Sequence, residues 1–510
     1  MSEDPATKKR IPLLGALAAM AIHLAANAHY GFFRDELYFI VCGRHPAFGY
    51  VDQPSLTPLL GALSQIFGIS LFALRAIPAI CAAIATYAAC AFALELGAGG
   101  FALVLTAIVT TLSPEMLAFG LRLSPDMIEF CTWPIIALIV LRIVKGADPR
   151  WWLGAGLVAA VAMWSKYSVL FFAVALVAGL ACTKERRVLR SPWFAASVAL
   201  AALLVLPNFL WQWKYDFPML QLLRNDYGKF LLHNPPFPVQ QIMIMGPQLS
   251  LVWMIGLVWL LVRSQTRFLG LAYVFLIAMM WALQAKNYYP ASIYPYLVAA
   301  GAVAIEGFTA GRRALQPVIA IAAVALAIPS LPFVLPVLPL PALIRYQHVM
   351  GRIFHVSFHT DERAGPDIPI QFYADMTGWP QLTAAVSKIY AALPAAQRRQ
   401  AAVFTHNFGE ASAIEIYRGP YKLPPPISAN NTFWIWGPRG YSGNVLIDVD
   451  GNLAIDRARF QSVRLGVVFH NPYAMPYEND FPIYVCTGIR QPLALLWPKL
   501  KNYSYGFEGL

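Results

Sequence analysis

Charged side chains are scarce in this sequence: they make up 13% of its 510 residues, about half the share of an ordinary soluble domain. Hydrophobic residues make up 58%, and the mean hydropathy is +0.55. Such a chain is too apolar to cover a water-exposed surface, which excludes an ordinary soluble protein. The composition predicts a polytopic membrane protein.

Cysteine is also scarce, with six residues in the chain. No CxxC pair and no cysteine–histidine spacing indicates a metal centre. Cys42 and Cys486 are both predicted on the exported side, which leaves a disulfide between them open, although nothing in the sequence brings them together. The other four lie within apolar runs, where a thiol behaves as a small hydrophobic side chain; they are Cys81, Cys90, Cys131 and Cys182.

Extended basic stripes are absent as well, although the formal net charge is +12. The basic residues form short clusters between apolar runs and are not interleaved with aromatic side chains, so we expect no nucleic-acid partner. Such clusters are typical of cytoplasmic loops that face anionic lipid. Lys8-Lys9-Arg10 precedes the first apolar run, and no small-residue cleavage site follows it, so we expect this run to stay as an anchor.

Eleven apolar runs are predicted to span the membrane. With the N-terminus in the cytoplasm, the basic clusters fall on cytoplasmic loops at every connection except the charge-free turn Gly97–Gly100, as the positive-inside rule requires. The C-terminus then lies on the exported side. The approximate bounds of the spans are 11–29, 71–96, 101–112, 121–144, 151–163, 167–181, 193–211, 248–262, 268–284, 290–306 and 315–338.

This topology gathers the polar connections on one face. The exported loop 30–58, the Ser124-Pro-Asp126 turn, Lys166, the loop 212–247 and Lys286 all fall on the exported side. A miscounted helix would scatter them, so their convergence favours both the topology and a single site on that face.

The composition changes after the proline-rich stretch Leu331–Pro341. We therefore divide the chain into a membrane domain, residues 1–340, and a small exported α/β domain, residues 341–510. Within the second domain the apolar runs predict a helix over Glu410–Tyr417 and three strands. These strands are Ala401–Thr405, Val445–Val449 and Ile483–Cys486.

The stretch Gly31–Pro54 concentrates two arginines, three carboxylates and a histidine directly after the first span. Charged groups beside a bilayer are costly, so such a cluster predicts a functional site. A short helix is expected to begin near Asp35 and to end at Gly43. The alternative is an amphipathic helix whose charges merely face water, but the number of charged groups favours the site.

Parts of this stretch resemble the first exported loop of bacterial family 39 glycosyltransferases, relatives of the protein O-mannosyltransferases and lipid A aminoarabinose transferases with the GT-C membrane fold. The resemblance implies that Asp35 is the catalytic base and that Glu36 stands beside it. It also implies a second acidic residue in the next exported loop, for which Asp126 is the candidate. The alternative for Asp126 is a helix N-cap. The matching segments are Phe33-Arg-Asp-Glu-Leu-Tyr38, Gly43-Arg-His45 and Gly49-Tyr-Val-Asp-Gln-Pro54.

A second resemblance lies in Lys286-Asn-Tyr-Tyr-Pro290 and the following Tyr294-Pro295, which is similar to the Lys/Arg-x-x-Tyr-x-x-Pro-x-x-Pro signature of the carrier-phosphate pocket in this family. Lys286 would supply a positive charge, and Tyr288 and Tyr289 hydroxyl donors. The alternative is a lysine that snorkels beside an aromatic belt. Lys166 and Tyr167 form a similar pair, and a lysine within an apolar region is costly unless it is paired.

Sugar transfer from a lipid-linked phosphate needs a carboxylate base, cations or donors for the departing phosphate, and an apolar groove for the polyprenyl chain. Arg34, Arg44, His45 and Asp52 either serve this pocket or tie the loop together. Because cationic side chains can neutralise the phosphate, we expect no cofactor and no obligatory divalent metal. His45 also has no second metal ligand nearby.

The sequence therefore predicts a polytopic α-helical membrane protein of the GT-C fold, with about eleven transmembrane helices and a small C-terminal exported α/β domain. The expected location is the bacterial inner membrane, with a cytoplasmic N-terminus and an extracytoplasmic C-terminal domain. The expected partners are a polyprenyl-phosphate-linked sugar, membrane lipid and an exported acceptor, which is a glycolipid, polysaccharide or protein.

Two other kinds of protein share parts of this pattern. A transporter or flippase of lipid-linked sugars would also be polytopic, but here the ionisable residues gather at one face and no inverted repeat of broken spans is visible. A non-catalytic relative would not need both Asp35 and Lys286. Both features favour the transferase.

Overall fold

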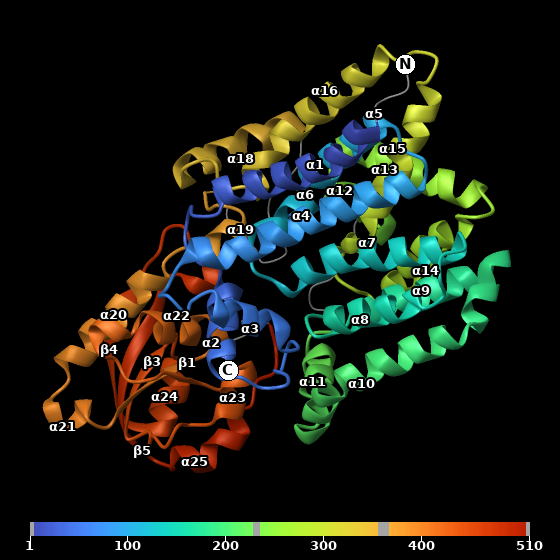
Figure 1. The fold of residues 1–510 in the computed structure, drawn as a ribbon. Coiled ribbons are helices and arrows are strands. Elements are labelled where there is room, and N and C mark those ends of the chain that lie inside the picture. Colours follow the sequence, from blue (N-terminus) through green and yellow to red (C-terminus); the bar gives the residue numbers. More distant parts are fainter. Residues whose placement is uncertain (1–4, 228–234, 355–366, 506–510) are drawn as a thin grey trace.

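The computed structural model describes residues 5–227, 235–354 and 367–505 and contains two parts (Figure 1). One part is a bundle of long helices from the N-terminal two thirds of the chain. The other is a small α/β unit, drawn in orange and red, at one end of that bundle. Helix α1 (Pro5–Ala26) begins at the far end of the bundle and ends toward this unit.

The bundle contains the helices that correspond to the predicted spans. Among the described residues, six segments are long and apolar enough to cross a membrane, or up to eight when two sharply bent helix pairs each count as one span. Three shorter apolar helices are Trp151–Met163, Val169–Ala181 and Arg267–Ala282. Length alone does not establish that every one crosses, so the count of eleven stays a prediction. Besides α1, the bundle helices are α4 (Leu71–Glu95), α5 (Gly100–Leu112), α7 (Pro125–Val144), α8 (Trp151–Met163), α9 (Val169–Ala181), α10 (Pro192–Lys214), α13 (Pro247–Val262), α14 (Arg267–Ala282), α15 (Tyr294–Phe308) and α16 (Leu315–Ala327).

Two glycines let α13 and α15 touch along their backbones. A methyl group on Gly256 would lie 1.9 Å from the carbonyl oxygen of Leu297, and one on Gly301 would lie 1.8 Å from that of Val252. Small residues permit this close approach between membrane helices. The contact fixes the start of α15 in the core, directly after the segment that carries Lys286.

Short helices connect the long ones. Helix α2 (Arg34–Arg44) packs against α3 (Leu56–Leu63) and against α22 (Phe408–Tyr417) of the small unit. The predicted helix in this loop is therefore confirmed to within one residue at each end. The other short helices are α6 (Pro114–Leu121), α11 (Pro218–Asn225), α12 (Phe237–Ile244), α17 (Leu331–Val334) and α18 (Leu340–Phe354).

The small unit is built on a five-stranded sheet of order β2-β1-β3-β5-β4. Strands β1 (Ala401–Thr405), β2 (Ile427–Ser428) and β3 (Val445–Val449) are parallel, whereas β4 (Phe460–Phe469) and β5 (Phe481–Ile489) join them in antiparallel pairs. One face packs against α20 (Trp379–Ala392) and α22 (Phe408–Tyr417), and the other against α25 (Leu493–Leu496). The remaining helices are α19 (Gln371–Ala374), α21 (Ala395–Arg398), α23 (Asn431–Trp436) and α24 (Leu453–Arg459).

The three predicted strands are confirmed as β1, β3 and the centre of β5, and the predicted helix as α22. Strand β4 was not predicted. Its ten residues are mostly exposed and include Arg464 and Gly466, so they form neither a clean alternation nor a continuous apolar run. Whether this unit is exported stays a prediction.

All six cysteines are free thiols. Cys42 is buried in the main core, whereas Cys486 is buried on the sheet face that packs against α25. The disulfide that the sequence left open is therefore not formed in this structure.

Candidate active site

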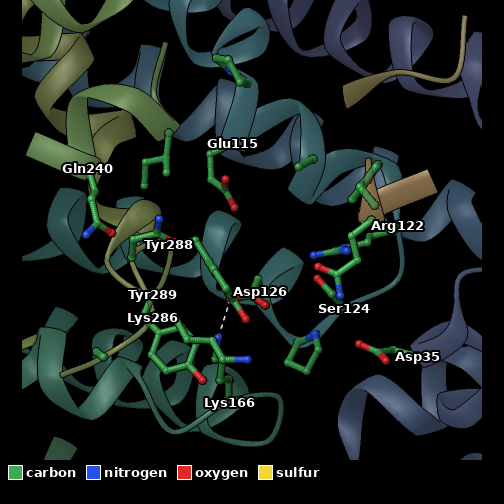
Figure 2. A pocket seen from close by; sticks show the side chains of 18 of the residues that line it. Asp35, Glu115, Arg122, Ser124, Asp126, Lys166, Gln240, Lys286, Tyr288 and Tyr289 are labelled. Atoms are coloured by element: carbon green, nitrogen blue, oxygen red, sulfur yellow. Dashed lines mark hydrogen bonds and ion pairs between the residues drawn. The ribbon is translucent and has the colours of Figure 1, made fainter. Parts of the chain in front are cut away.

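A cavity of about 1120 Å³ lies where the bundle meets the small unit. Segments far apart in the sequence line it: the loop that begins α2, the start of α7, the breaks after α8 and α14, and the residues around α19. It brings together eight of the sequence-predicted site residues, several of which Figure 2 shows from close by. These eight are Arg34, Asp35, Asp52, Asp126, Lys166, Lys286, Tyr288 and Tyr289.

Asp35 stands in the first turn of α2, which Phe33 precedes in an extended conformation. Its side chain is 38% exposed, and the nearest cation is the Nε of Arg34 at 3.4 Å from Oδ1. The guanidinium of Arg34 also lies 3.7 Å from Asp375 of the small unit. Asp35 thus presents a partly exposed carboxylate to the cavity, next to an arginine that is shared with a second acid.

Glu36 does not line the cavity, which corrects the prediction that it stands beside Asp35 in the site. Its buried carboxylate forms an ion pair with Arg75, 2.9 Å from Nη2, and also accepts hydrogen bonds from the backbone N–H groups of Phe33 (2.8 Å) and Leu123 (3.0 Å). Successive helical residues point about 100° apart, so Glu36 turns into the protein where Asp35 turns outward.

Arg75 extends this network to the end of α1. Its guanidinium donates to the carbonyl oxygens of Asn27 (3.2 Å), His29 (3.2 Å) and Gly31 (2.8 Å). Glu36 and Arg75 together therefore fasten the loop between α1 and α2, helix α4 and the segment that leads to Asp126. Their role is to hold the site in shape.

Asp52 lines the cavity from the far end of the same loop and is buried. It accepts a hydrogen bond from the Tyr38 hydroxyl at 3.0 Å, and the same hydroxyl lies 2.6 Å from Oγ1 of Thr432 in α23. Burial raises the pKa of Asp52 to about 7. Asp52 thus lies where the loop meets the small unit.

Asp126 and Lys166 form an ion pair of 2.6 Å inside the cavity, drawn as a dashed line in Figure 2. Ser124 occupies the N-cap position of α7, so Asp126, in the first turn, is not the N-cap that the sequence left as an alternative. The ammonium of Lys166 also lies 3.9 Å from the ring centre of Tyr289 and 5.2 Å from that of Tyr288. The lysine in the break between α8 and α9 is therefore paired, as its cost in an apolar region requires.

Lys286 projects from the break between α14 and α15. Its ammonium lies 5.2 Å from the ring centre of Tyr505, a residue of the small unit. The segment is held in place by Gln241 of α12, whose amide donates to the carbonyl oxygen of Asn287 at 2.9 Å. Two lysines from different breaks thus meet aromatic rings in one cavity.

The cavity opens along apolar side chains near Lys286. Met243, Trp281 and Leu223 line it and are about half exposed. They come from α12, α14 and α11, so three helices supply an exposed apolar side of the cavity, which we call the apolar groove. Such a surface suits an apolar chain attached to a group held at the lysines.

Three other predicted residues do not reach the cavity, which corrects their assignment. Arg44 and His45 are exposed at the end of α2. The His45 ring lies 4.6 Å from that of Trp436, and its pKa is lowered by partial burial and then by Arg439. The Tyr167 hydroxyl donates to Asn208 of α10. His45 and Tyr167 thus contact neighbouring elements outside the cavity, whereas Arg44 is exposed.

The cavity also contains residues that the sequence did not single out. The guanidinium of Arg122 lies between two rings, 4.7 Å from Phe33 and 4.8 Å from Phe372. Glu115, in the first turn of α6, lines the same space. Arg122 could have been predicted, because it lies in the segment that leads to Asp126. No sequence pattern indicated Glu115.

No group of three or more histidine, cysteine, aspartate or glutamate residues suited to a metal ion occurs in the part of the chain that the structure describes. Asp126 is already bound to Lys166. The expectation that transfer needs no divalent metal stays a prediction.

Comparisons with known proteins bear on the family and the fold. A family model described as dolichyl-phosphate-mannose-protein mannosyltransferase matches residues 52–211. Two crystal structures of ArnT from Cupriavidus metallidurans, one bound to undecaprenyl phosphate and one in the apo state, each have a TM-score of 0.54 and 11% identity, over 92% of this chain and 97% of that chain. No curated protein matches the sequence significantly. The resemblance to GT-C glycosyltransferases of the protein mannosyltransferase and ArnT type is confirmed, and the chain has the ArnT fold.

Proposed function

We propose that this protein transfers a sugar from a polyprenyl-phosphate-linked donor to a hydroxyl group of an exported acceptor. One observation carries the proposal: an exposed carboxylate, Asp35, and two lysines, Lys166 and Lys286, line one cavity at the end of the helical bundle. The undecaprenyl phosphate bound in one of the ArnT structures supports the class of donor.

Asp35 acts as the general base. Its carboxylate accepts the proton of the acceptor hydroxyl as that oxygen attacks the anomeric carbon of the sugar. The bond between this carbon and the phosphate oxygen breaks, and the carrier phosphate leaves with the electron pair. A single displacement of this kind inverts the configuration at the anomeric carbon, and it needs no second carboxylic acid because phosphate is already a good leaving group.

Lys166 and Lys286 stabilise the charge that gathers on the departing phosphate. Asp126 holds Lys166 in place and keeps it charged, because the two groups lie 2.6 Å apart. The hydroxyls of Tyr288 and Tyr289 add donors. The polyprenyl chain lies along the apolar groove beside Met243, Trp281 and Leu223.

The reaction takes place on the outer face of a bacterial inner membrane. The basic clusters near Arg142, Arg187, Arg263 and Arg312 support a cytoplasmic position for the opposite end of the bundle. Lipid and polysaccharide profiling of a deletion strain would identify the sugar and the acceptor, which is a glycolipid, polysaccharide or protein.

The test uses the purified protein in nanodiscs with undecaprenyl-phosphate-linked sugars, with products followed by mass spectrometry. Asp35→Asn keeps the shape of the side chain and removes its basicity, so turnover should fall about 10²–10⁴-fold. Asp367→Asn is the matched control, because that side chain is 89% exposed and lies outside the cavity. Near-normal turnover of Asp35→Asn would show that another residue is the base. Glu115→Gln would then be tested, because Glu115 also lines the cavity.

A further inference from the structure

The segment that follows η6 (Trp497–Leu500) in the small unit returns to the helical bundle. The side chain of Asn225 donates to the carbonyl oxygen of Tyr503 at 2.8 Å, and the buried Asp226 accepts from the Ser504 hydroxyl (2.6 Å) and from the backbone N–H of Tyr505 (2.7 Å). Asn225 and Asp226 form the end of α11. This segment is therefore anchored to the bundle by several hydrogen bonds.

The same segment is held by the small unit. The side-chain amide of Asn430 donates to the carbonyl oxygen of Ser504 at 3.1 Å, and the backbone N–H of Ser504 donates to Asn431 at 3.2 Å. The Tyr503 ring packs with Val51 of the exported loop. Because the backbone is fixed from both sides, the direction of the next side chain, that of Tyr505, is fixed as well.

Tyr505 points into the cavity. Among the described residues after Phe372, it is the one that lines this space. Its ring faces the Lys286 ammonium at 5.2 Å, and its hydroxyl donates to the carbonyl oxygen of Asp52 at 3.4 Å. A single side chain of the small unit thus touches both the phosphate side of the site and the loop that carries Asp35.

We propose that Tyr505 is a positioning residue that holds Lys286 at the carrier phosphate, so that the small α/β unit completes the active site. This inference rests on the proposed function. Lysine has a flexible four-carbon stem, and an ammonium facing an aromatic ring is attracted by the negative face of that ring. The ring restricts Lys286 to the part of the cavity where a phosphate would be neutralised.

The test measures binding of undecaprenyl phosphate to the purified full-length protein in nanodiscs. Tyr505→Leu removes the ring and should weaken binding about tenfold, the size of a desolvated cation–π contact. Tyr505→Phe keeps the ring and loses one long hydrogen bond, so it should recover most of this affinity, to within about threefold of the wild type. Tyr421→Leu, an exposed tyrosine of the same unit outside the cavity, is the control.

A double-mutant cycle with Lys286→Gln separates positioning from a general structural role. If Tyr505 acts through Lys286, adding Tyr505→Leu to Lys286→Gln should cost no further affinity. A full tenfold loss in that background, or wild-type binding by Tyr505→Leu alone, overturns the inference while the phosphate role of Lys286 stands. Wild-type binding by Lys286→Gln overturns that role and this inference together. The melting temperature of each variant, measured beside Tyr421→Leu, identifies a loss of affinity caused by unfolding.

Discussion

Replacing Glu36 by glutamine should destabilise the protein more than the loss of any exposed ion pair. The side chains of Glu36 and Arg75 are both completely buried. Two guanidinium nitrogens and two backbone N–H groups converge on the carboxylate. Glu36→Gln leaves the charge of Arg75 buried without its counter-charge, and the amide of glutamine offers an N–H group where two acceptors are needed.

Breaking a buried ion pair by removing one partner costs about 3–5 kcal/mol, because the remaining charge is uncompensated. The pair between Glu95 and Arg142 provides the comparison within the same chain. Its atoms lie closer, at 2.7 Å, but the two side chains are 27% and 38% exposed. Exposed pairs contribute about 0–1 kcal/mol, so Glu95→Gln should cost at most about 1 kcal/mol.

The assay is unfolding of the purified variants by titration with SDS in mixed micelles, followed by circular dichroism. Glu36→Gln should lower the unfolding free energy by several times the change in Glu95→Gln, and replacing Glu36 and Arg75 together by leucine and methionine should restore part of the loss. Equal stability of Glu36→Gln and Glu95→Gln would refute the reasoning.

Three further predictions follow from the same structure. Lys286→Ala should lower both turnover and donor affinity, and Lys286→Arg should recover part of the loss. If Lys286 only snorkels, Lys286→Gln should instead keep near-normal activity. Loss of activity with a chelator and its recovery with Mg²⁺ would contradict a site in which lysines neutralise the phosphate. Asp52 has a pKa of about 7 when folded and about 4 when unfolded. The folded protein therefore keeps a proton that the unfolded chain releases, so thermal stability should fall as pH rises from about 4 to 7, and Asp52→Asn should flatten this slope; equal slopes would contradict the shift. Reporter fusions should be cytoplasmic after Lys145, Arg190 and Arg263 and exported after Asp52 and Asp375. A cytoplasmic signal at Asp375 would contradict the prediction that the active site lies on the exported side.

The sequence predicted the helices and the strands β1, β3 and β5 because each is a local apolar run. It placed Asp35, Asp126, Lys166 and Lys286 in one site because the predicted topology assigns each polar connection to one of the two sides of the membrane, and all four fall on the same side. Arguments of this kind need neither long-range contacts nor side-chain directions.

Side-chain direction was the information that the sequence lacked. Glu36 and Asp35 are adjacent, yet one is buried against Arg75 and the other faces the cavity. The partner of Glu36 lies in a different helix, so no local pattern could have revealed it. Tyr505 enters the site only because the small unit folds back on the bundle, and a lone tyrosine far along the chain carries no such signal.

The partners of the carboxylates decide which of them can act as the base. Glu36 is saturated by four donors and lies outside the cavity. Asp126 is held by Lys166 at 2.6 Å, and taking a proton there would cost it this ion pair. Glu115 lines the cavity from the first turn of α6, whereas Asp35 stands in the first turn of α2, with a 38% exposed side chain and its nearest cation at 3.4 Å. We therefore expect Asp35 to be the base, because its exposed carboxylate can take a proton without breaking a close ion pair.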